Sequence, residues 1–259
     1  MRSEHQHRKD ICEIGRRLYQ KGFVAAADGN ISVRLDGGRL LVTPSGKCKG
    51  RLDEEDLIVT DDAGRRIYGS WEPSSEIAMH VTAYRERPDV KAVVHAHPPH
   101  ATGFAVAGVA LDRPLISEVV LTLGTIPLAE YGTPSTLEVP AAIEPYIRRH
   151  DAILLANHGA MAVGPDVFLA YDRMETLEHF AHIWTVARIL GRERPLGEEH
   201  VTKLQAIRER AGFEPPTRAC LTCPVLDERL GGSAPETVQL TREQLVDLVT
   251  DVVRSLEGR

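Results

Sequence analysis

Hydrophobic positions with a helical period mark the beginning of the chain. Ile11, Ile14 and Leu18 recur at spacings of three and four residues, and Gly22 follows the last of them. This spacing places the apolar side chains on one face of a helix, and a glycine just beyond the pattern is a common stop signal. The pattern therefore predicts an amphipathic helix that ends near Gly22.

Short runs of β-forming residues, separated by turn residues, come next. Such pairs of runs around a glycine-containing turn are typical of β-hairpins. The pattern predicts two hairpins, with strands at 31–35 and 39–43 and at 56–60 and 65–68. We therefore expect antiparallel pairing in this part of the chain.

The remaining pattern alternates between strands and helices. Ile77, His80, Val81 and Tyr84 share one face of a predicted helix, for which Ser74 or Ser75 is a suitable N-cap. Helices are predicted at 76–87, 137–149, 166–190 and 198–211, with a helix of small residues after Pro99. Strands are predicted at 91–97, 125–128, 152–155 and 159–163.

The last part of the chain differs in composition. Residues 212–236 contain four prolines and read as a linker or a surface arm. Thr241 and Gln244 form a capping box ahead of a final apolar stripe, which predicts a C-terminal amphipathic helix. We expect a catalytic domain at 1–212, and an arm plus helix at 213–259 that packs on the same domain or on a neighbouring subunit.

Composition and charge narrow the class of protein. The 259 residues are 42% hydrophobic and 26% charged, values typical of a globular domain, and 31 basic against 37 acidic residues give a net charge of −6. The sequence contains no run of basic residues of the kind that predicts nucleic-acid binding. No apolar stretch approaches the roughly 20 residues of a membrane helix, and the charged amino terminus does not resemble a signal peptide. We therefore expect a cytoplasmic protein with neither a nucleic-acid nor a membrane partner.

Four cysteines, at 12, 48, 220 and 223, are too few and too scattered for a disulfide framework. Cys220 and Cys223 have the spacing of a zinc ribbon or redox pair, but the sequence holds no second pair and no thioredoxin-like context. Reduced thiols are the simpler interpretation.

Three histidines form a candidate metal site. His95 and His97 lie two residues apart near the end of a predicted strand, so their imidazoles point to the same side. His158 follows another predicted strand in the segment Ala156-Asn157-His158-Gly159. Three imidazoles that leave a fourth position open are typical of a Lewis-acid zinc centre. An isolated His-x-His pair would otherwise be two surface side chains on an edge strand.

Other histidines offer weaker alternatives. His100 lies beyond two prolines, where a role at a helix start or in support of the metal ligands is expected. Glu175, His179 and His182 share one helical face, which is more typical of a polar surface than of a metal site.

The segment Pro73-Ser74-Ser75-Glu76 combines hydroxyls with the amino-terminal end of a predicted helix, a favourable place for an anion. A phosphate there would bring Glu76 close to the substrate, whereas a carboxylate that only favours the helix dipole is the alternative. Gly29-Asn30-Ile31-Ser32 and Thr43-Pro44-Ser45-Gly46 could also cradle an anion, although each alone is a turn. Lys47 and Lys49 could add positive charge nearby, or could simply be exposed.

Five motifs occur in order along the chain: GNIS at 29–32, TPSG at 43–46, PSSE at 73–76, HAHPPH at 95–100 and NHG at 157–159. Together they resemble the class II aldolase family typified by L-fuculose-1-phosphate aldolase, which also includes L-ribulose-5-phosphate 4-epimerase and the adducin head domain. The resemblance covers about residues 8–192. It implies a three-layer α/β/α sandwich, of the α/β class, with a largely antiparallel central sheet. It also implies a homotetramer with active sites between subunits.

The resemblance assigns roles to residues that match the motifs. It implies zinc ligation by His95, His97 and His158, with Mn²⁺ or Co²⁺ as alternatives, and acid/base catalysis by Glu76. It implies phosphate binding by Asn30, Ser45, Gly46, Ser74 and Ser75. One departure concerns a tyrosine that the fuculose enzymes take from a neighbouring subunit. The matching segment here reads Leu115-Ile116-Ser117-Glu118, so Glu118 occupies its place, and Tyr131 is a substitute candidate.

The expected reaction is reversible cleavage of a short ketose 1-phosphate to dihydroxyacetone phosphate and an aldehyde, through a metal-stabilised enediolate. Glu76 would move the proton next to the carbonyl. Decarboxylation of a keto-acid phosphate and sugar-phosphate epimerisation are alternatives on the same fold. An adducin-like interaction module without a metal is the non-enzymatic alternative, and the intact set of histidines and Glu76 disfavours it.

Overall fold

A computed structural model describes residues 2–211 of the chain. The predicted linker, the predicted C-terminal helix and the pair Cys220 and Cys223 lie outside the described residues. Within the described part, no helix is both long and apolar enough to cross a membrane.

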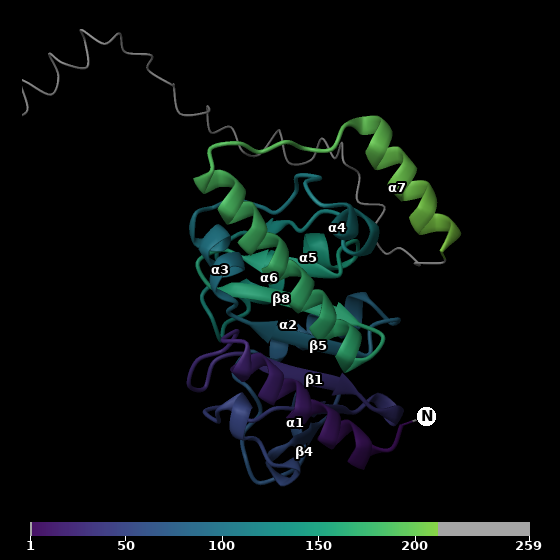
Figure 1. Ribbon diagram of the computed structural model, residues 1–259. Helices are drawn as coiled ribbons and strands as arrows, with labels where there is room; N and C mark the ends of the chain where they lie inside the picture. Colours follow the sequence, from purple (N-terminus) through teal and green to yellow (C-terminus); the bar gives the residue numbers. More distant parts are fainter. Residues whose placement is uncertain (1, 212–259) are drawn as a thin grey trace, which may run out of the picture. The chain divides into compact units, whose positions relative to one another are not determined.

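The described chain forms one eight-stranded sheet with the strand order β4-β3-β2-β1-β5-β8-β7-β6 (Figure 1). Its strands are β1 Asn30–Arg34, β2 Leu40–Val42, β3 Ile58–Thr60, β4 Arg66–Tyr68, β5 Ala92–Ala96, β6 Leu128–Ala129, β7 Ala152–Leu155 and β8 Gly159–Gly164. Every neighbouring pair is antiparallel except β6 with β7. The predicted hairpins and the largely antiparallel sheet are therefore confirmed.

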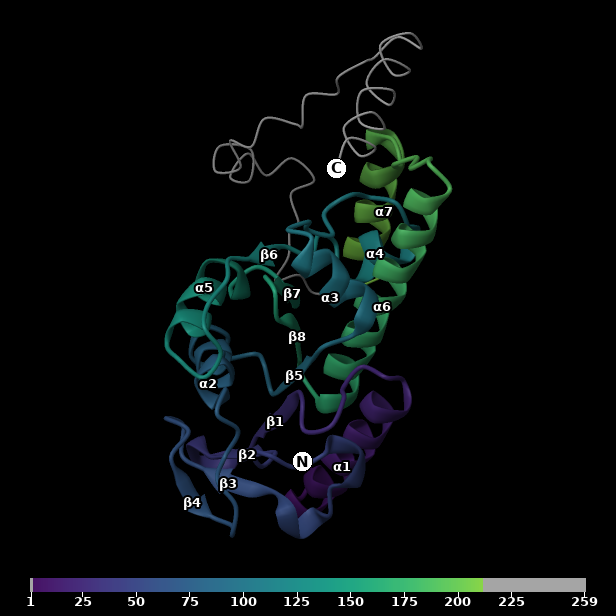
Figure 2. The ribbon, with the colours of Figure 1, turned by 90° about the vertical axis from the view of Figure 1, so that its left-hand side faces the viewer.

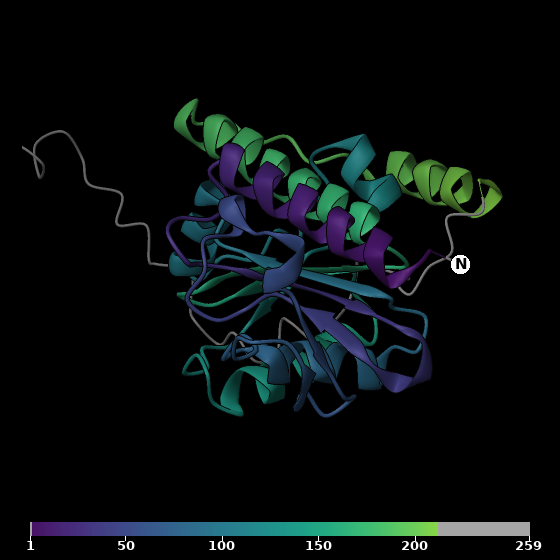
Figure 3. The same ribbon diagram turned by 90° about the horizontal axis from the view of Figure 1, so that it is seen from below.

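Helices cover both faces of this sheet (Figures 2 and 3). The first face carries α1 Glu4–Gln20, α3 Pro99–Val106 and α6 Val167–Ile189. The opposite face carries α2 Ile77–Glu86 and α5 Glu138–Ile147. Two further helices, α4 Ser117–Thr122 and α7 Glu198–Arg210, pack against each other, and short 3-10 turns occur at η1 Asp36–Gly38, η2 Lys49–Arg51 and η3 Glu54–Asp56. The expected three-layer α/β/α sandwich is confirmed.

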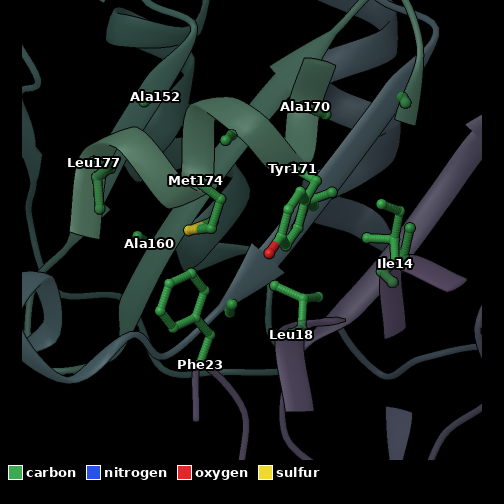
Figure 4. Packing of buried hydrophobic residues seen from close by; sticks show 14 of the residues in the cluster. Ile14, Leu18, Phe23, Ala152, Ala160, Ala170, Tyr171, Met174 and Leu177 are labelled. Atoms are coloured by element: carbon green, nitrogen blue, oxygen red, sulfur yellow. The ribbon is translucent and has the colours of Figure 1, made fainter. Parts of the chain in front are cut away.

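Two hydrophobic clusters fill the spaces between the layers. In the first, Ile14 and Leu18 of α1 lie close to Tyr171 and Met174 of α6 (Figure 4). The second cluster lies on the opposite side of the sheet, under α2 and α5. Successive residues of β5 contribute to different clusters, because Val94 belongs to the first and Val93 to the second. Side chains alternate along a strand, so His95 points to the same side as Val93, toward α2.

Two expectations for local structure need correction, and one helix was not expected. The N-cap of α2 is Glu76 rather than Ser74 or Ser75. Ser74 instead forms a local turn in which its Oγ accepts from the Glu76 N–H at 3.3 Å and its carbonyl accepts from the Ile77 N–H at 3.1 Å. The strand expected at 125–128 is shifted to Leu128–Ala129, where it pairs in parallel with β7, and the pattern did not predict α4.

Candidate metal centre

The three candidate histidines meet where β5 ends and β8 begins. These strands are antiparallel neighbours, and Ala96 pairs with Ala160, so the end of β5 lies beside the turn that precedes β8. That turn carries His158 next to Gly159. A Cβ at Gly159 would lie 2.6 Å from the Ala96 carbonyl oxygen and 2.6 Å from Cδ2 of His97. The close approach of the two backbones therefore requires glycine there.

One nitrogen from each of these histidines lies within 4.8 Å of the others. The Nε2 atoms of His95 and His97 are 3.2 Å apart. Two zinc ligands in a tetrahedral arrangement, with Zn–N bonds of about 2.0–2.1 Å, are roughly 3.3 Å apart. The spacing fits two ligands of one ion, and this is the one metal-compatible group found within residues 2–211.

A hydrogen bond orients the His95 ring, and burial keeps the His97 ring neutral, and both effects favour binding of a cation. The Nδ1–H of His95 donates to the Ala160 carbonyl at 2.9 Å, which leaves Nε2 directed at the centre. Burial, together with the neighbouring imidazoles of His95 and His158, lowers the pKa of His97 to about 4, so that ring is neutral at physiological pH. Neutral imidazoles are the form that binds divalent metals. The donor set therefore fits zinc, and it also suits other divalent ions.

Glu76 completes the centre from the amino-terminal end of α2. Its Oε2 lies 3.3 Å from Nε2 of His95, and its Oε1 lies 3.1 Å from Nε2 of His158. Burial alone would raise the pKa of this carboxyl, but the facing imidazoles of His158 and His95 outweigh burial and hold the pKa well below its usual range. A bound cation would act in the same direction, so Glu76 rests here as a carboxylate.

A cavity of about 330 Å³ opens above Glu76. The residues that line it include the predicted phosphate-binding residues, the acid/base candidate and two of the candidate metal ligands: Asn30, Ser45, Gly46, Ser74, Ser75, Glu76, His97 and His158. His95 lies beneath this surface and is fully buried. The structure thus brings all the predicted phosphate-binding residues to the cavity next to the candidate metal ligands.

Backbone contacts join the two serine turns of this cavity. The Ser45 N–H donates to the Glu72 carbonyl at 2.9 Å, and the Ser74 N–H donates to the Thr43 carbonyl at 3.3 Å. Gly46 has a φ of 71°, in the left-handed region where a side chain would strain the backbone. These contacts hold Ser45 and Ser74 at the same rim although 29 residues separate them in the sequence.

Lys49 also lines the cavity, and the sequence did not reveal its burial. The residue is only 1% exposed, and its Nζ donates to the carbonyls of Ala27 and Lys47, each at 2.7 Å. Burial lowers the pKa of Lys49 to about 8. Lys47, by contrast, pairs with Asp56. Lys49 is therefore a buried cation for which no carboxylate partner is found among the described residues.

Asn30 differs in its placement from the other candidate phosphate ligands. Its amide nitrogen donates to Oε2 of Glu76 at 2.9 Å, and its amide oxygen accepts from Nε2 of His80. Both ends of the amide are therefore occupied within the protein. The side chain acts on the carboxylate of Glu76, and a phosphate role for Asn30 remains a prediction.

The alternative histidine cluster has other contacts. Glu178 caps the start of α3, because its two carboxylate oxygens accept from the backbone N–H groups of His100 at 3.0 Å and Ala101 at 2.8 Å. His100 stacks on His182 with ring centroids 4.0 Å apart, and Glu175 pairs with Lys21 at 2.7 Å. These contacts hold α3 and α1 against α6, and they agree with the structural interpretation of this cluster.

Two residues were considered in connection with the family tyrosine: Glu118, which occupies its place in the sequence, and Tyr131, a possible substitute. Neither of them lines this cavity. Glu118 lies in α4, and Tyr131 is 58% exposed. Neither side chain is placed to move a proton in the cavity of its own chain.

Comparison with known proteins adds to this geometry. Residues 9–185 match the family model described as the class II aldolase and adducin N-terminal domain. The chain belongs to this family. The 3-oxo-tetronate 4-phosphate decarboxylase of Pectobacterium atrosepticum is 34% identical over 186 residues, which cover 70% of this chain and 84% of that protein.

Aldolases of the family are similar to the same extent. The L-fuculose phosphate aldolase of Methanococcus maripaludis strain C7 is 34% identical over 176 residues, or 67% of this chain and 91% of that protein. The crystal structure of L-fuculose-1-phosphate aldolase from Thermus thermophilus is 34% identical and has a TM-score of 0.65, with 75% of this chain and 100% of that chain covered. Sequence similarity therefore supports a class II aldolase superfamily enzyme without separating the two reactions.

Proposed function

We propose that this chain is a metal-dependent aldolase that reversibly cleaves a short ketose 1-phosphate into dihydroxyacetone phosphate and an aldehyde. The observation that carries the proposal is the position of Glu76. Its carboxylate lies 3.3 Å and 3.1 Å from two candidate metal ligands, His95 and His158, at the base of a cavity with two serine turns at its rim. An ion site, a proton-transfer group and an anion cradle are thus next to one another.

His95, His97 and His158 would hold the ion, which we take to be Zn²⁺, with Mn²⁺ or Co²⁺ as compatible substitutes. A divalent ion there supplies a Lewis acid that stabilises negative charge on the oxygens next to the bond that breaks. The Ala160 carbonyl keeps the His95 ring oriented, and Asp28, 3.6 Å from Nδ1 of His97, faces the second ring.

Glu76 moves the proton at the carbon next to the carbonyl. In the cleavage direction the electron pair of the broken carbon–carbon bond stays on the dihydroxyacetone phosphate half. Glu76, which rests as a carboxylate, takes up a proton from solvent and delivers it to that carbon to complete the product. In the synthetic direction Glu76 removes the same proton. A second proton must leave the substrate hydroxyl that becomes the aldehyde, and we assign no residue to that transfer.

The rim of the cavity binds the phosphate. Ser45, Gly46, Ser74 and Ser75 offer hydroxyls and backbone close to the carboxylate, and Lys49 adds a buried positive charge. Binding energy from the phosphate then holds the reacting carbon beside Glu76. The charge of Lys49, which the carboxylates of Asp28 and Glu76 offset only in part, favours an anionic substrate over a neutral one.

Decarboxylation of a 3-oxo sugar-acid phosphate is the second candidate, favoured by the similarity to the Pectobacterium decarboxylase. There the bond to the carboxylate breaks, carbon dioxide leaves, and one proton, which Glu76 takes up from solvent, completes the product. This reaction needs no acceptor for a hydroxyl proton. It therefore suits a cavity whose lining, within residues 2–211, contains no tyrosine.

We also propose that the protein works as a homotetramer with its active sites between subunits, as its family implies. The hydroxyl proton of the aldol reaction would then pass to a group of a neighbouring subunit. Sedimentation of the full chain tests the assembly, and a monomer that is fully active would contradict it.

Incubation of the metal-loaded protein with ketose 1-phosphates and 3-oxo-acid phosphates, followed by product identification, distinguishes the reactions. Dihydroxyacetone phosphate plus an aldehyde supports the aldolase. Carbon dioxide plus a ketose phosphate supports the decarboxylase instead. Turnover of neither class, by protein that carries its metal, contradicts both proposals.

A further inference from the structure

A row of buried polar side chains leads away from Glu76 into the space between β1 and α2. Ser32 and His80 are 0% and 2% exposed, and Tyr84 is 6% exposed. Oγ of Ser32 lies 2.7 Å from Nδ1 of His80 and 2.8 Å from the hydroxyl of Tyr84. With the contacts of Asn30 to His80 and Glu76, these groups form one buried hydrogen-bond chain, Tyr84–Ser32–His80–Asn30–Glu76.

The direction of every hydrogen bond in this chain is determined by its last member. A carboxylate only accepts, so the Asn30 amide must present its nitrogen to Glu76 and its oxygen to His80. His80 must then carry its proton on Nε2, and its Nδ1 accepts from the Ser32 hydroxyl. Ser32 in turn accepts from the hydroxyl of Tyr84.

His80 is suited to this fixed role because it does not become charged. Burial, with a smaller contribution from His95, lowers the pKa of His80 to about 3. A neutral ring with its proton on Nε2 makes one donor and one acceptor contact at once. If the Asn30 amide turned over, its NH₂ group would face the N–H of His80 and its oxygen would face the carboxylate. Both contacts would be repulsive.

We propose that His80 is a positioning residue that acts through Asn30: it locks the amide so that an N–H holds and orients the carboxylate of Glu76 beside the metal site. The role in turnover rests on the proposed function. The hydrogen-bond chain itself does not depend on which reaction the site catalyses.

A test without substrate uses ¹⁵N NMR of the metal-free full-length protein. We expect His80 to keep its proton on Nε2 and none on Nδ1 throughout about pH 5–8. The side-chain NH₂ of Asn30 should be protected from exchange with water. His80→Leu should remove this protection, whereas His80→Gln, whose amide can still donate to Asn30, should retain it. A proton on Nδ1 of His80, or unchanged protection in His80→Leu, would overturn the proposal.

The kinetic test compares the same variants after metal loading. For His80→Leu we expect kcat to fall about 10–100-fold, the loss usual for a residue that supports a site from outside, while KM changes little. His80→Gln should recover most of kcat. Tyr84→Phe is the matched control, because it shortens the chain at its far end but leaves the His80–Asn30 contact in place, so kcat should stay close to wild type.

These outcomes separate a positioning role from a merely structural one. A structural role predicts lower thermal stability in both His80→Leu and Tyr84→Phe with kcat unchanged, which would contradict the proposal. If His80→Leu does not fold, His80→Gln and the proton position in the wild-type protein still decide it. An inactive wild-type protein would contradict the proposed function alone, because the NMR result does not need turnover.

Discussion

Replacement of Glu76 by glutamine separates catalysis from helix stabilisation. The variant keeps the size of the side chain and its place at the N-cap of α2. Its amide oxygen can still accept from Nδ2 of Asn30, and its NH₂ group can face Nε2 of His158, 3.1 Å from the present carboxylate oxygen. The fold and the phosphate site should therefore survive, and only the proton-accepting group is lost.

The two roles of Glu76 predict different magnitudes. Loss of a general base lowers a rate by about 10²–10⁴-fold, equivalent to roughly 3–5 kcal/mol of activation free energy. Loss of a favourable helix-dipole contact costs only about 0.3–1 kcal/mol of stability and leaves the chemistry intact. The difference is large enough for one assay to decide.

The assay is NMR of the exchange of the α-proton of dihydroxyacetone phosphate with deuterated water. Metal-loaded Glu76→Gln should exchange this proton about 10²–10⁴-fold more slowly than wild type while it still binds metal and phosphate. Glu72→Gln, which removes an exposed carboxylate from the same loop, is the control and should exchange at the wild-type rate. Exchange by Glu76→Gln at the wild-type rate would refute the assignment.

Three further predictions concern the surroundings of the site. Ser75→Ala should raise KM for a phosphorylated substrate by the equivalent of about 1.5–3 kcal/mol, and steady-state kinetics should show no such change for an unphosphorylated analogue. Burial holds the pKa of Lys49 near 8, so the ammonium group loses its charge above that pH. Calorimetry should therefore show that the affinity of the wild-type protein for sulfate falls as the pH rises through about 8. Lys49→Met should not show this pH dependence. Glu178→Ala should lower the free energy of unfolding by about 1–3 kcal/mol in denaturant titrations, because two backbone N–H groups of α3 lose their acceptor, while metal content stays unchanged.

The sequence was most informative where a periodic pattern reports a buried face directly. The valine-rich run that became β5 placed His95 and His97 on one side of the sheet, and the hairpins identified the antiparallel pairing. The turn before β8 could be located, because a strand pattern stops at Leu155 and resumes at Gly159. Contacts that follow from strand alternation were therefore predictable.

Contacts between distant segments were not predictable in this way. Lys49 reads as an exposed lysine, because its burial depends on the carbonyl of Ala27, which another segment brings to it. The N-cap of α2 moved to Glu76 because Ser74 uses its hydroxyl in a local turn. Both features depend on how separate loops meet.

The buried hydrogen-bond chain did leave a signal in the sequence. Asn30 and Ser32 are two residues apart in β1, which begins one residue before the predicted strand at 31–35. His80 and Tyr84 are four residues apart on the predicted helix face. Polar side chains at these spacings share one face of each element, and both faces are buried. Pairing the two faces would have required knowledge that α2 packs over β1.

We propose that His95, His97 and His158 together hold one catalytic divalent ion. The decisive test is elemental analysis of the purified full chain beside a variant in which all three histidines are changed to alanine. We expect about one ion per wild-type chain and none in the variant, with circular dichroism showing both proteins folded. A folded, metal-free wild-type protein that takes up no added zinc, or a variant that retains its ion, would contradict the claim.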